Sequence, residues 1–485
     1  MEPASHIPPP PSTSTFIELG LDHKSELSSN NSEDAHNNVP LRPVDGGLGA
    51  WSFLAAAFVV ETIVWGIPNA YGIFLDSYLQ DPRYVSQQSA TSLLPLIGTL
   101  SSGIIYCSGP VVNPIAARYP HHRRKSMWLG AALCCGTLFG ASYATQIYQL
   151  ILLQGVLYAI GGSLLYLPCI SYLSEWFIAR RGMANGILFA GTATGGVLFP
   201  LLLPPLIATR GLSQALRILS IVVGGFLFPL LPFVRARLPL TRVRVYKLAP
   251  RHGASGARDW VRNENFWILL TVNTVQGFAY FVPIIYLPTF ANDLHISPSN
   301  AAVTLAMLNG ASVVGRVSMG YLSDKFNPWI LALTALSTAS VATFILWGVL
   351  SRSFAGLLAF SIVYGSAAGG WTSLWTGFVR PLAKEDPAKL TTLYGFLLLS
   401  RGIGNIVSTP ISTRLYAQLH AASGTAGSTP STGFDVGGGR FKSMIIYVGT
   451  CFAGAAGVAA LGWAMDAGKR GRRGQQDSVS AREAD

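Results

Sequence analysis

The chain has 485 residues, of which 50% are apolar and only 12% are charged, and its mean hydropathy is +0.41. An ordinary soluble domain carries about 25% charged residues, so the composition argues against a soluble multidomain protein. The aromatic content of 11% excludes disorder of the whole chain. The five cysteines lie in apolar runs without metal-ligand spacing, so the sequence indicates neither a disulfide scaffold nor a metal site.

Residues 1–44 form a polar segment rich in Pro, Ser and Asn, without an apolar run. The segment lacks the basic start and apolar core of a signal peptide. We therefore expect a disordered cytosolic tail.

From Trp51 onward, apolar runs long enough to cross a bilayer recur to the end of the fold. Backbone polar groups in lipid must be satisfied internally, so each run is predicted to be a helix. The predicted spans are 51–78, 90–116, 126–144, 147–172, 183–208, 214–234, 265–290, 299–321, 329–349, 353–377, 390–413 and 443–466.

The net charge of +12 comes from 34 basic and 22 acidic residues, and their placement predicts the orientation. With the N-terminus inside, about 25 of the basic residues fall in inner segments and about seven in outer loops. We therefore expect an integral multi-pass protein with both termini in the cytosol. The plasma membrane is the expected location, with the vacuolar membrane as the alternative. Because the positive charge follows the topology, it does not indicate nucleic-acid binding.

A basic loop at 235–264 divides the spans six and six, and the halves echo each other. The nine-residue spacing from Gly191 to Pro200 recurs from Arg401 to Pro410. This predicts an all-α membrane protein with twelve transmembrane helices in two pseudo-symmetric six-helix bundles, the architecture of major facilitator transporters. The predicted parts are a tail at 1–44, a bundle at 45–234, a linker at 235–264, a bundle at 265–466 and a cytosolic tail at 467–485.

Three motifs narrow the resemblance: the Asp-Gly-Gly start at 45–47, the segment 176–186 with its Arg-Arg pair, and the segment 315–325. Together they resemble the monocarboxylate-porter family of the major facilitator superfamily. The run 69–74 resembles the fungal branch of that family. Physically, Asp45 is positioned to cap the first helix, and the glycines permit a tight entry.

The resemblance also shows which charges are missing. The best-known members of the family carry a Lys after a Pro in the first helix and an Asp four residues before an Arg in the eighth. Here Asn69 follows Pro68, and Ser312 lies four residues before Arg316. The Arg is kept while the acid and the Lys are absent, which argues against lactate-type transport through the usual residues.

Three ionisable residues remain inside predicted spans: Glu61, Arg316 and Arg401. A charge at the bilayer centre costs about 2.5–3.5 kcal/mol on insertion scales, so each is a functional candidate. Arg401 is predicted to bind a substrate carboxylate, and Glu61 is the candidate for carrying a coupling proton. Arg316 is a candidate for substrate binding or gating, and its position near the inner motif favours gating.

Polar and aromatic residues in the spans are predicted to line a central cavity. Asn273, Gln276 and Tyr280 recur at helical spacing and so share a face that is unsuited to lipid. The other candidates are Asn69, Tyr71, Asn309 and Trp371. For a single Trp, helix packing or an interfacial position is the simpler interpretation. Together these residues indicate an aromatic or amphipathic organic solute.

Charges on two equivalent inner loops are candidates for the inner gate: Arg180, Arg181, Asp324 and Lys325. The resemblance implies that such loop charges latch the gate. Anchoring of the topology by basic residues is the alternative explanation.

The sequence thus predicts a secondary transporter, not an enzyme, for a small organic solute such as a monocarboxylate or a secondary metabolite. No phosphate-binding loop, catalytic constellation, metal site or cofactor site is evident. The expected partners are an organic anion, membrane lipid and a proton as the coupling ion, without nucleic acid. A non-transporting nutrient receptor on the same fold remains the alternative.

Overall fold

The computed structural model describes residues 42–238, 260–383, 386–420 and 431–484, and these residues form helices and no strands. Most of the predicted tail at 1–44 and of the linker at 235–264 therefore lies outside the described residues. The part from Pro43 onward is a single compact unit. Its all-helical architecture confirms the predicted fold class.

The first half contains long helices joined by short breaks. Proline and glycine interrupt several of them, and a π-helical stretch at Ile151–Leu157 joins α8 to α9. The elements are α2 (Gly47–Asn69), α3 (Tyr71–Gln80), α4 (Pro82–Val85), α5 (Ala90–Cys107), α6 (Gly109–Arg118), η1 (Pro120–His122), α7 (Arg123–Ala141), α8 (Ile147–Leu150), η2 (Ile151–Leu157), α9 (Tyr158–Trp176), α10 (Arg181–Arg210) and α11 (Leu212–Leu230).

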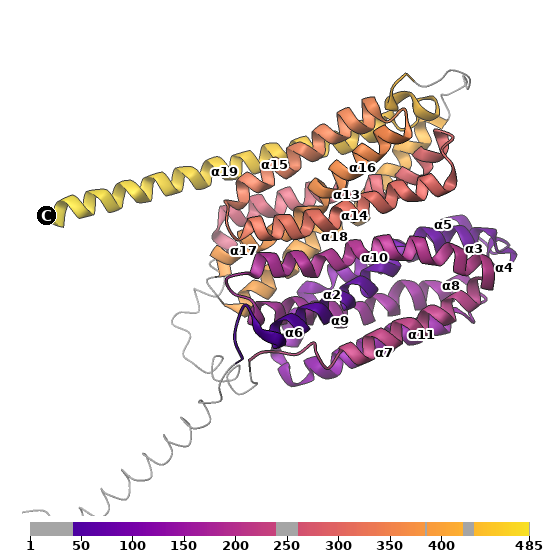
Figure 1. Ribbon diagram of the computed structural model, residues 1–485, viewed down its shortest axis with the longest axis horizontal. Coiled ribbons are helices and arrows are strands. Elements are labelled where there is room, and N and C mark those ends of the chain that lie inside the picture. The colour runs from indigo at the N-terminus through magenta and orange to yellow at the C-terminus, as the bar shows by residue number, and fades with distance from the viewer. Residues whose placement is uncertain (1–41, 239–259, 384–385, 421–430, 485) are drawn as a thin grey trace, which may run out of the picture. The chain divides into compact units, whose positions relative to one another are not determined.

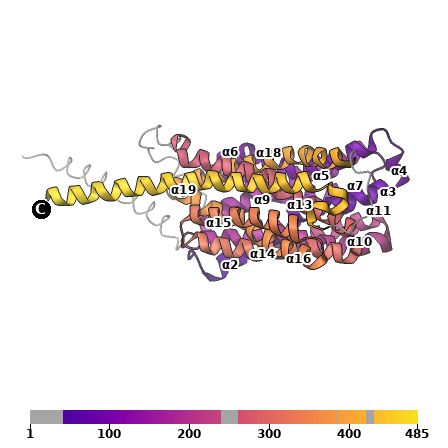
Figure 2. The ribbon, with the colours of Figure 1, turned by 90° about the horizontal axis from the view of Figure 1, so that it is seen from above.

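The second half has the same character, with a further π-helical stretch at Ala342–Leu350 and a 3₁₀ segment at Gly370–Leu374. Its elements are α13 (Glu264–Asp293), α14 (Pro298–Ser323), α15 (Pro328–Val341), η4 (Ala342–Leu350), α16 (Phe354–Gly369), η5 (Gly370–Leu374), α17 (Trp375–Ala383), α18 (Pro387–His420), η6 (Gly433–Gly439) and α19 (Lys442–Ala484). The helix α19 continues through the segment 467–484, where the sequence suggested a tail (Figures 1 and 2).

Short polar residues start the helices of the second half. The side chains of Asn263, Ser297, Asn327 and Ser353 each accept a hydrogen bond from a backbone amide in the first turn that follows. These bonds satisfy amides that have no partner within the helix. Local sequence therefore sets where these helices begin.

Ten helices in the described part of the chain are long and apolar enough to cross a membrane. The pair Leu93–Cys107 and Gly109–Arg118, bent by 45°, makes an eleventh if it is counted as one span. The remaining predicted span at 126–144 corresponds to α7, which begins with Arg123, Arg124 and Lys125 and is therefore less apolar. The multi-pass membrane architecture is confirmed, while the count of twelve stays a prediction.

Helices of the two halves lie side by side and pack along their length (Figure 1). The most extensive contact between the halves joins α10 to α14, and a second contact joins α5 and α6 to α18. Glycines permit the first: a Cβ at Gly320 would lie 2.5 Å from the carbonyl oxygen of Gly182, and one at Gly186 would lie 2.5 Å from that of Arg316. The interface between the halves therefore depends on residues without side chains.

Candidate functional site

The segment between α9 and α10 is held by the carboxylate of Asp45. Its two oxygens accept hydrogen bonds of 2.8–3.0 Å from the backbone amides of Ile178, Ala179 and Arg180. The sequence suggested that Asp45 caps the first helix, but Gly46 occupies the cap position without a side-chain hydrogen bond. Partial burial raises the pKa of Asp45, and the three amides outweigh this effect, so its pKa lies below the ordinary value.

A second carboxylate, from the other half, meets the start of α10. Asp324 accepts hydrogen bonds from the amides of Gly182 at 2.8 Å and Met183 at 2.9 Å. The first turn of a helix offers free amides and a partial positive charge, so a carboxylate is stabilised there. Burial nevertheless raises the pKa of Asp324 above its ordinary value. We call Asp45, the segment 177–183 and Asp324 the inner latch.

The basic residues proposed for the gate have different positions. Arg181 is buried and donates to the carbonyl oxygens of Phe177 at 3.0 Å and Ser174 at 3.2 Å, both in its own half. Arg180 is exposed, and the ammonium of Lys325, which follows α14, donates to the hydroxyl of Tyr321 near the end of that helix. At this point the halves are joined by the carboxylate of Asp324, which accepts from the backbone amides of Gly182 and Met183.

A layer of buried polar groups also joins the halves next to the inner latch. The amide nitrogen of Asn185 donates to the hydroxyls of Thr376 at 2.9 Å and Tyr394 at 3.0 Å. Those two hydroxyls bond each other at 2.7 Å. Because α10 belongs to one half and α17 and α18 to the other, separating the halves here must break these bonds.

Midway along the helices, Arg401 is the most deeply buried of the described arginines. Its side chain is 1% exposed, and one terminal nitrogen donates to the amide oxygen of Gln276 at 2.5 Å. The guanidinium carbon lies 4.5 Å from the ring centre of Tyr280 and 5.5 Å from that of Phe281. Its Nε has no hydrogen-bond partner among the described residues. A buried guanidinium with a free donor is suited to an anionic ligand.

Arg316 lies beside the same tyrosine. It donates to the hydroxyls of Ser312 and Tyr280, both at 3.2 Å, and to the carbonyl oxygen of Phe189 in the opposite half. Ser312 thus supplies a neutral acceptor at the position where the best-known monocarboxylate porters carry an Asp. Tyr280 connects the two cations, since Arg316 bonds its hydroxyl and Arg401 lies over its ring.

Glu61 is the buried carboxyl of the first half. Its Oε1 accepts a hydrogen bond of 2.6 Å from the hydroxyl of Thr192, while Oε2 has no partner among the described residues. The glycine at 191 brings α10 against α2 here, because a Cβ would lie 2.5 Å from the carbonyl oxygen of Phe58. Glu61 is 1% exposed and interacts electrostatically with Arg316.

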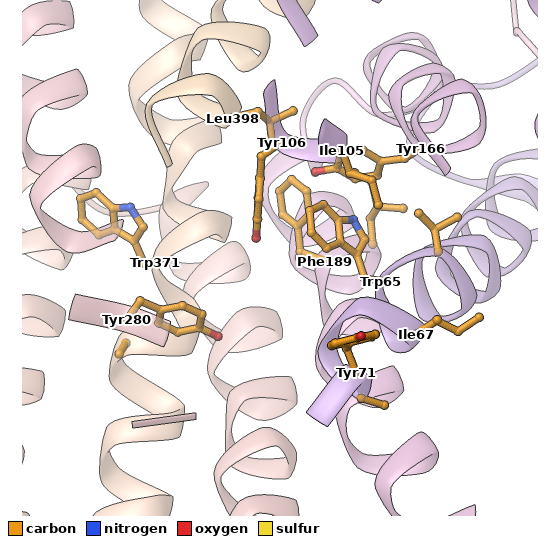
Figure 3. Close-up of a cluster of buried hydrophobic side chains, with 14 of the residues drawn as sticks. Trp65, Ile67, Tyr71, Ile105, Tyr106, Tyr166, Phe189, Tyr280, Trp371 and Leu398 are labelled. Carbon is orange, nitrogen blue, oxygen red and sulfur yellow. The ribbon is translucent and has the colours of Figure 1, made fainter. Parts of the chain in front are cut away.

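Aromatic side chains from both halves form a buried cluster (Figure 3). The Trp65 ring centre lies 4.3 Å from that of Tyr106 and 5.5 Å from that of Tyr166. Across the interface, Tyr106 lies 6.2 Å from Phe281. Figure 3 shows Tyr106 between Trp65 and Phe189 on one side and Tyr280 and Trp371 on the other. We call the rings at 65, 106, 166, 189, 280 and 281, with Arg316 and Arg401, the central cluster.

Asn273 and Trp371 form a tight hydrogen-bonded group next to the central cluster. The amide oxygen of Asn273 accepts from the indole nitrogens of Trp371 at 2.7 Å and Trp375 at 3.0 Å. Its amide nitrogen donates to the carbonyl oxygen of Leu397 and the hydroxyl of Ser400. The donors and acceptor of Asn273 are thus used within the protein, which favours a supporting role.

Three further sequence candidates are engaged in helix contacts away from the two arginines. The hydroxyl of Tyr71 donates to the Leu94 carbonyl oxygen at 2.6 Å. The amide nitrogens of Asn69 and Asn309 donate to the carbonyl oxygens of Thr192 at 3.4 Å and Gly196 at 3.2 Å. The structure therefore brings together Gln276, Tyr280, Arg316 and Arg401, but not these three.

The sequence interpretation missed most aromatic members of the central cluster. Trp65, Tyr106, Tyr166, Phe189 and Phe281 lie within apolar runs, where an aromatic residue is usually core. The signal that would have found Trp65 is its position four residues after Glu61, one helical turn along the same face. Among the described residues, no group of three or more His, Cys, Asp or Glu side chains is placed to hold a metal ion.

Comparison with known families gives one broad match. The family model described as Major Facilitator Superfamily matches residues 53–409, which is most of the chain. The solved structure of the proton:xylose symporter XylE has a TM-score of 0.62 and 15% sequence identity, covering 84% of this chain and 94% of that one. At this identity the likeness shows the fold.

Several curated fungal transporters are similar over most of their length. The MFS-type transporter hasB of Aspergillus fumigatus is 32% identical over 386 residues, covering 76% of this chain and 83% of that protein. The Fujikurins efflux protein of Gibberella fujikuroi is 28% identical over 384 residues, covering 79% of both chains. The Aspyridones efflux protein apdF of Emericella nidulans is 28% identical over 372 residues, covering 76% of this chain and 72% of that protein.

Proposed function

Because this chain belongs to the major facilitator superfamily and is a membrane transporter, we propose that it exports a small acidic metabolite with an aromatic or conjugated part. The observation that carries this proposal is the unpartnered Nε of buried Arg401 among aromatic rings from both halves. A buried donor without a partner costs free energy, which an anionic ligand would recover.

A second unpartnered donor supports the same ligand chemistry. The indole nitrogen of Trp65 is buried without a hydrogen-bond partner among the described residues. Its ring contacts Tyr106, which in turn interacts with Arg401. The Trp65 indole nitrogen and the Arg401 Nε are two donors separated by Tyr106, so they suit a solute with two acceptor groups some distance apart. The aromatic rings between these donors suit a flat apolar part of the same solute.

The direction of transport is proposed from the relatives. Two of them are described as efflux proteins, for fujikurins and for aspyridones. The matching spans of sequence support export of a related class of product, from the cytosol across the plasma membrane. The proposal assumes the orientation that the distribution of basic residues predicts, with both termini in the cytosol.

Proton coupling is proposed to run through Glu61. Its Oε2 has no hydrogen-bond partner within the described ranges. Its Oε1 accepts from Thr192 in α10, the helix that also supplies the Phe189 carbonyl oxygen to Arg316. Protonation of Glu61 would change the charge balance around Arg316. This change would couple the binding of an anionic solute at Arg316 to the protonation state of Glu61.

Access to the central cluster requires the halves to move apart. Its arginines and Trp65, Tyr106, Tyr166, Phe189 and Tyr280 are all less than 9% exposed in this conformation. The inner latch and the Asn185 layer join the halves on the side predicted to be cytosolic. Their opening would admit a cytosolic solute, and separation at the opposite end would release it.

The test is transport into inverted vesicles that contain the purified protein. A panel of aromatic carboxylates, enolic metabolites and matched neutral esters is offered with and without an inward-acid pH gradient. We expect the anions to accumulate and the esters not to. Arg401→Ala should reduce anion uptake by about 100-fold or more, as loss of a charged bidentate contact implies. Arg401→Lys should restore only part of it.

The matched control is Arg352, an exposed residue that follows the end of η4. Arg352→Ala removes the same charge and should transport as the wild type does. Equal uptake of anions and esters, or full uptake by Arg401→Ala, would contradict the proposal. Saturable binding of a solute without flux would instead favour a receptor.

A further inference from the structure

A cavity of about 810 Å³ lies apart from the central cluster, where four candidate spans end together. Its lining comes from the start of α13, the start of α15, the end of α17 and the region of α19 around Lys469. Tyr280 lies 16 residues further along α13 than Glu264, which is about 24 Å of helix. The cavity is therefore at the level of the membrane surface and not at the midplane.

The inner wall of the cavity is apolar. Trp329 and Phe378 meet edge to face with ring centres 4.7 Å apart, and both are buried. Leu269, also buried, and Leu382 extend this wall. Aromatic residues are enriched where a membrane protein meets the headgroup region, and these side chains suit the glycerol and first acyl carbons of a lipid.

The rim of the cavity carries two basic residues, Arg262 and Lys469, and two acidic residues, Glu264 and Asp466. The ammonium of Lys469 lies 3.0 Å from a carboxylate oxygen of Glu264, and both side chains are more than half exposed. An exposed pair of this kind is weak and exchanges partners readily. The amide oxygen of Asn265 is buried and lacks a hydrogen-bond partner among the described residues.

From this arrangement we propose that the cavity binds the headgroup of a phosphoethanolamine lipid from the inner leaflet. The primary ammonium would donate to Glu264, Asp466 and the Asn265 amide oxygen, and the phosphate would accept from Arg262 and Lys469. A net-neutral rim favours a zwitterion over an anionic lipid. Three acceptors favour an ammonium with N–H groups over a quaternary one, which has none to donate.

The test measures thermal unfolding of the detergent-purified full chain with added lipid. The probes are dioleoyl phosphatidylethanolamine, the matching phosphatidylcholine and phosphatidylglycerol, and soluble glycerophosphoethanolamine. We expect phosphatidylethanolamine to raise Tm at the lowest concentration. The double variant Glu264→Gln with Asp466→Asn should bind it about tenfold more weakly, whereas its response to anionic phosphatidylglycerol should grow because the rim is then net positive.

A matched control is Asp76→Asn, which removes an exposed carboxylate from α3 in the other half. It should keep the preference for phosphatidylethanolamine. Equal responses of the wild type to all three lipids would overturn the proposal, as would an unchanged preference in the double variant. An equal effect of glycerophosphoethanolamine would overturn the assignment to a lipid. Native mass spectrometry of retained lipid repeats the comparison without relying on Tm.

Discussion

In the inner latch every carboxylate oxygen accepts a hydrogen bond from a backbone amide. In and beside the central cluster, by contrast, several buried polar atoms have no partner in the described part of the chain. Asp45 and Asp324 are both satisfied by the protein itself. The Nε of Arg401, the Trp65 indole nitrogen and Oε2 of Glu61 are not. The difference separates a region built to hold a conformation from a region suited to receive a solute and a proton.

The largest effect is expected where the two regions share α10 and α14. A Cβ at Gly320 would lie 2.5 Å from the carbonyl oxygen of Gly182 and 2.9 Å from the Cα of Gly186. Gly320→Val should therefore keep the halves apart at the inner latch and reduce transport by about 100-fold or more. Uptake by vesicles checks this, with equal membrane insertion verified on the same samples.

The control for Gly320→Val lies in the same helix. A Cβ at Gly310 meets nothing within 4 Å, so Gly310→Val should transport nearly as the wild type does. Normal transport by Gly320→Val would show that the close approach of α10 to α14 is not needed in the cycle.

The second largest effect is expected at Glu61, one of the buried groups without a full set of partners among the described residues. Glu61→Gln keeps an oxygen acceptor for the Thr192 hydroxyl and removes the site that takes up a proton. We expect the stimulation of uptake by a pH gradient to disappear, while binding of the anion persists within about threefold. Uptake is measured with and without the gradient, and binding by titration of the purified protein. A variant that still responds to the gradient would exclude Glu61 as the coupling residue.

Prediction from sequence was most successful where one physical rule decides the outcome. Lipid requires satisfied backbone groups, so apolar length predicts the helical fold. The sequence did not predict that Arg316 and Arg401 both contact Tyr280, because no local pattern relates α14 to α18. The monocarboxylate-porter resemblance stays a prediction. The Asp45 contacts cross 133 to 135 residues of chain, and no local pattern distinguishes them from a helix cap.

Within the inner latch, Asp324→Asn is expected to have a smaller effect than Gly320→Val. The variant keeps one oxygen acceptor but loses the negative charge that strengthens the hydrogen bonds from both amides. A hydrogen bond to a charged group contributes about 1.5–3 kcal/mol. The closed population should fall by about tenfold or more relative to the open one. Spin labels at exposed Arg180 and Lys325, one in each half, report the separation. An unchanged distance distribution would remove Asp324 from the latch.

The smallest effect is expected at Asp45, whose contacts all lie within one half and need not break when the halves move. Asp45→Asn should lower stability by about 1 kcal/mol, since the carboxylate is partly exposed, and should leave transport within about twofold. The pKa of Asp45 is lowered in the folded protein, so its contribution is complete above the ordinary carboxyl pKa of about 4. It is lost as the pH falls through the lower folded value.

The difference in Tm between wild type and Asp45→Asn should accordingly be constant from pH 7 to about pH 5 and shrink below about pH 4. Asp76→Asn, which removes a carboxylate outside the latch, is the matched control for the loss of a surface charge. A transport defect in Asp45→Asn as large as that of Asp324→Asn would mean that the segment 177–183 transmits force between the halves. Asp45 would then belong to the part of the inner latch that moves during transport.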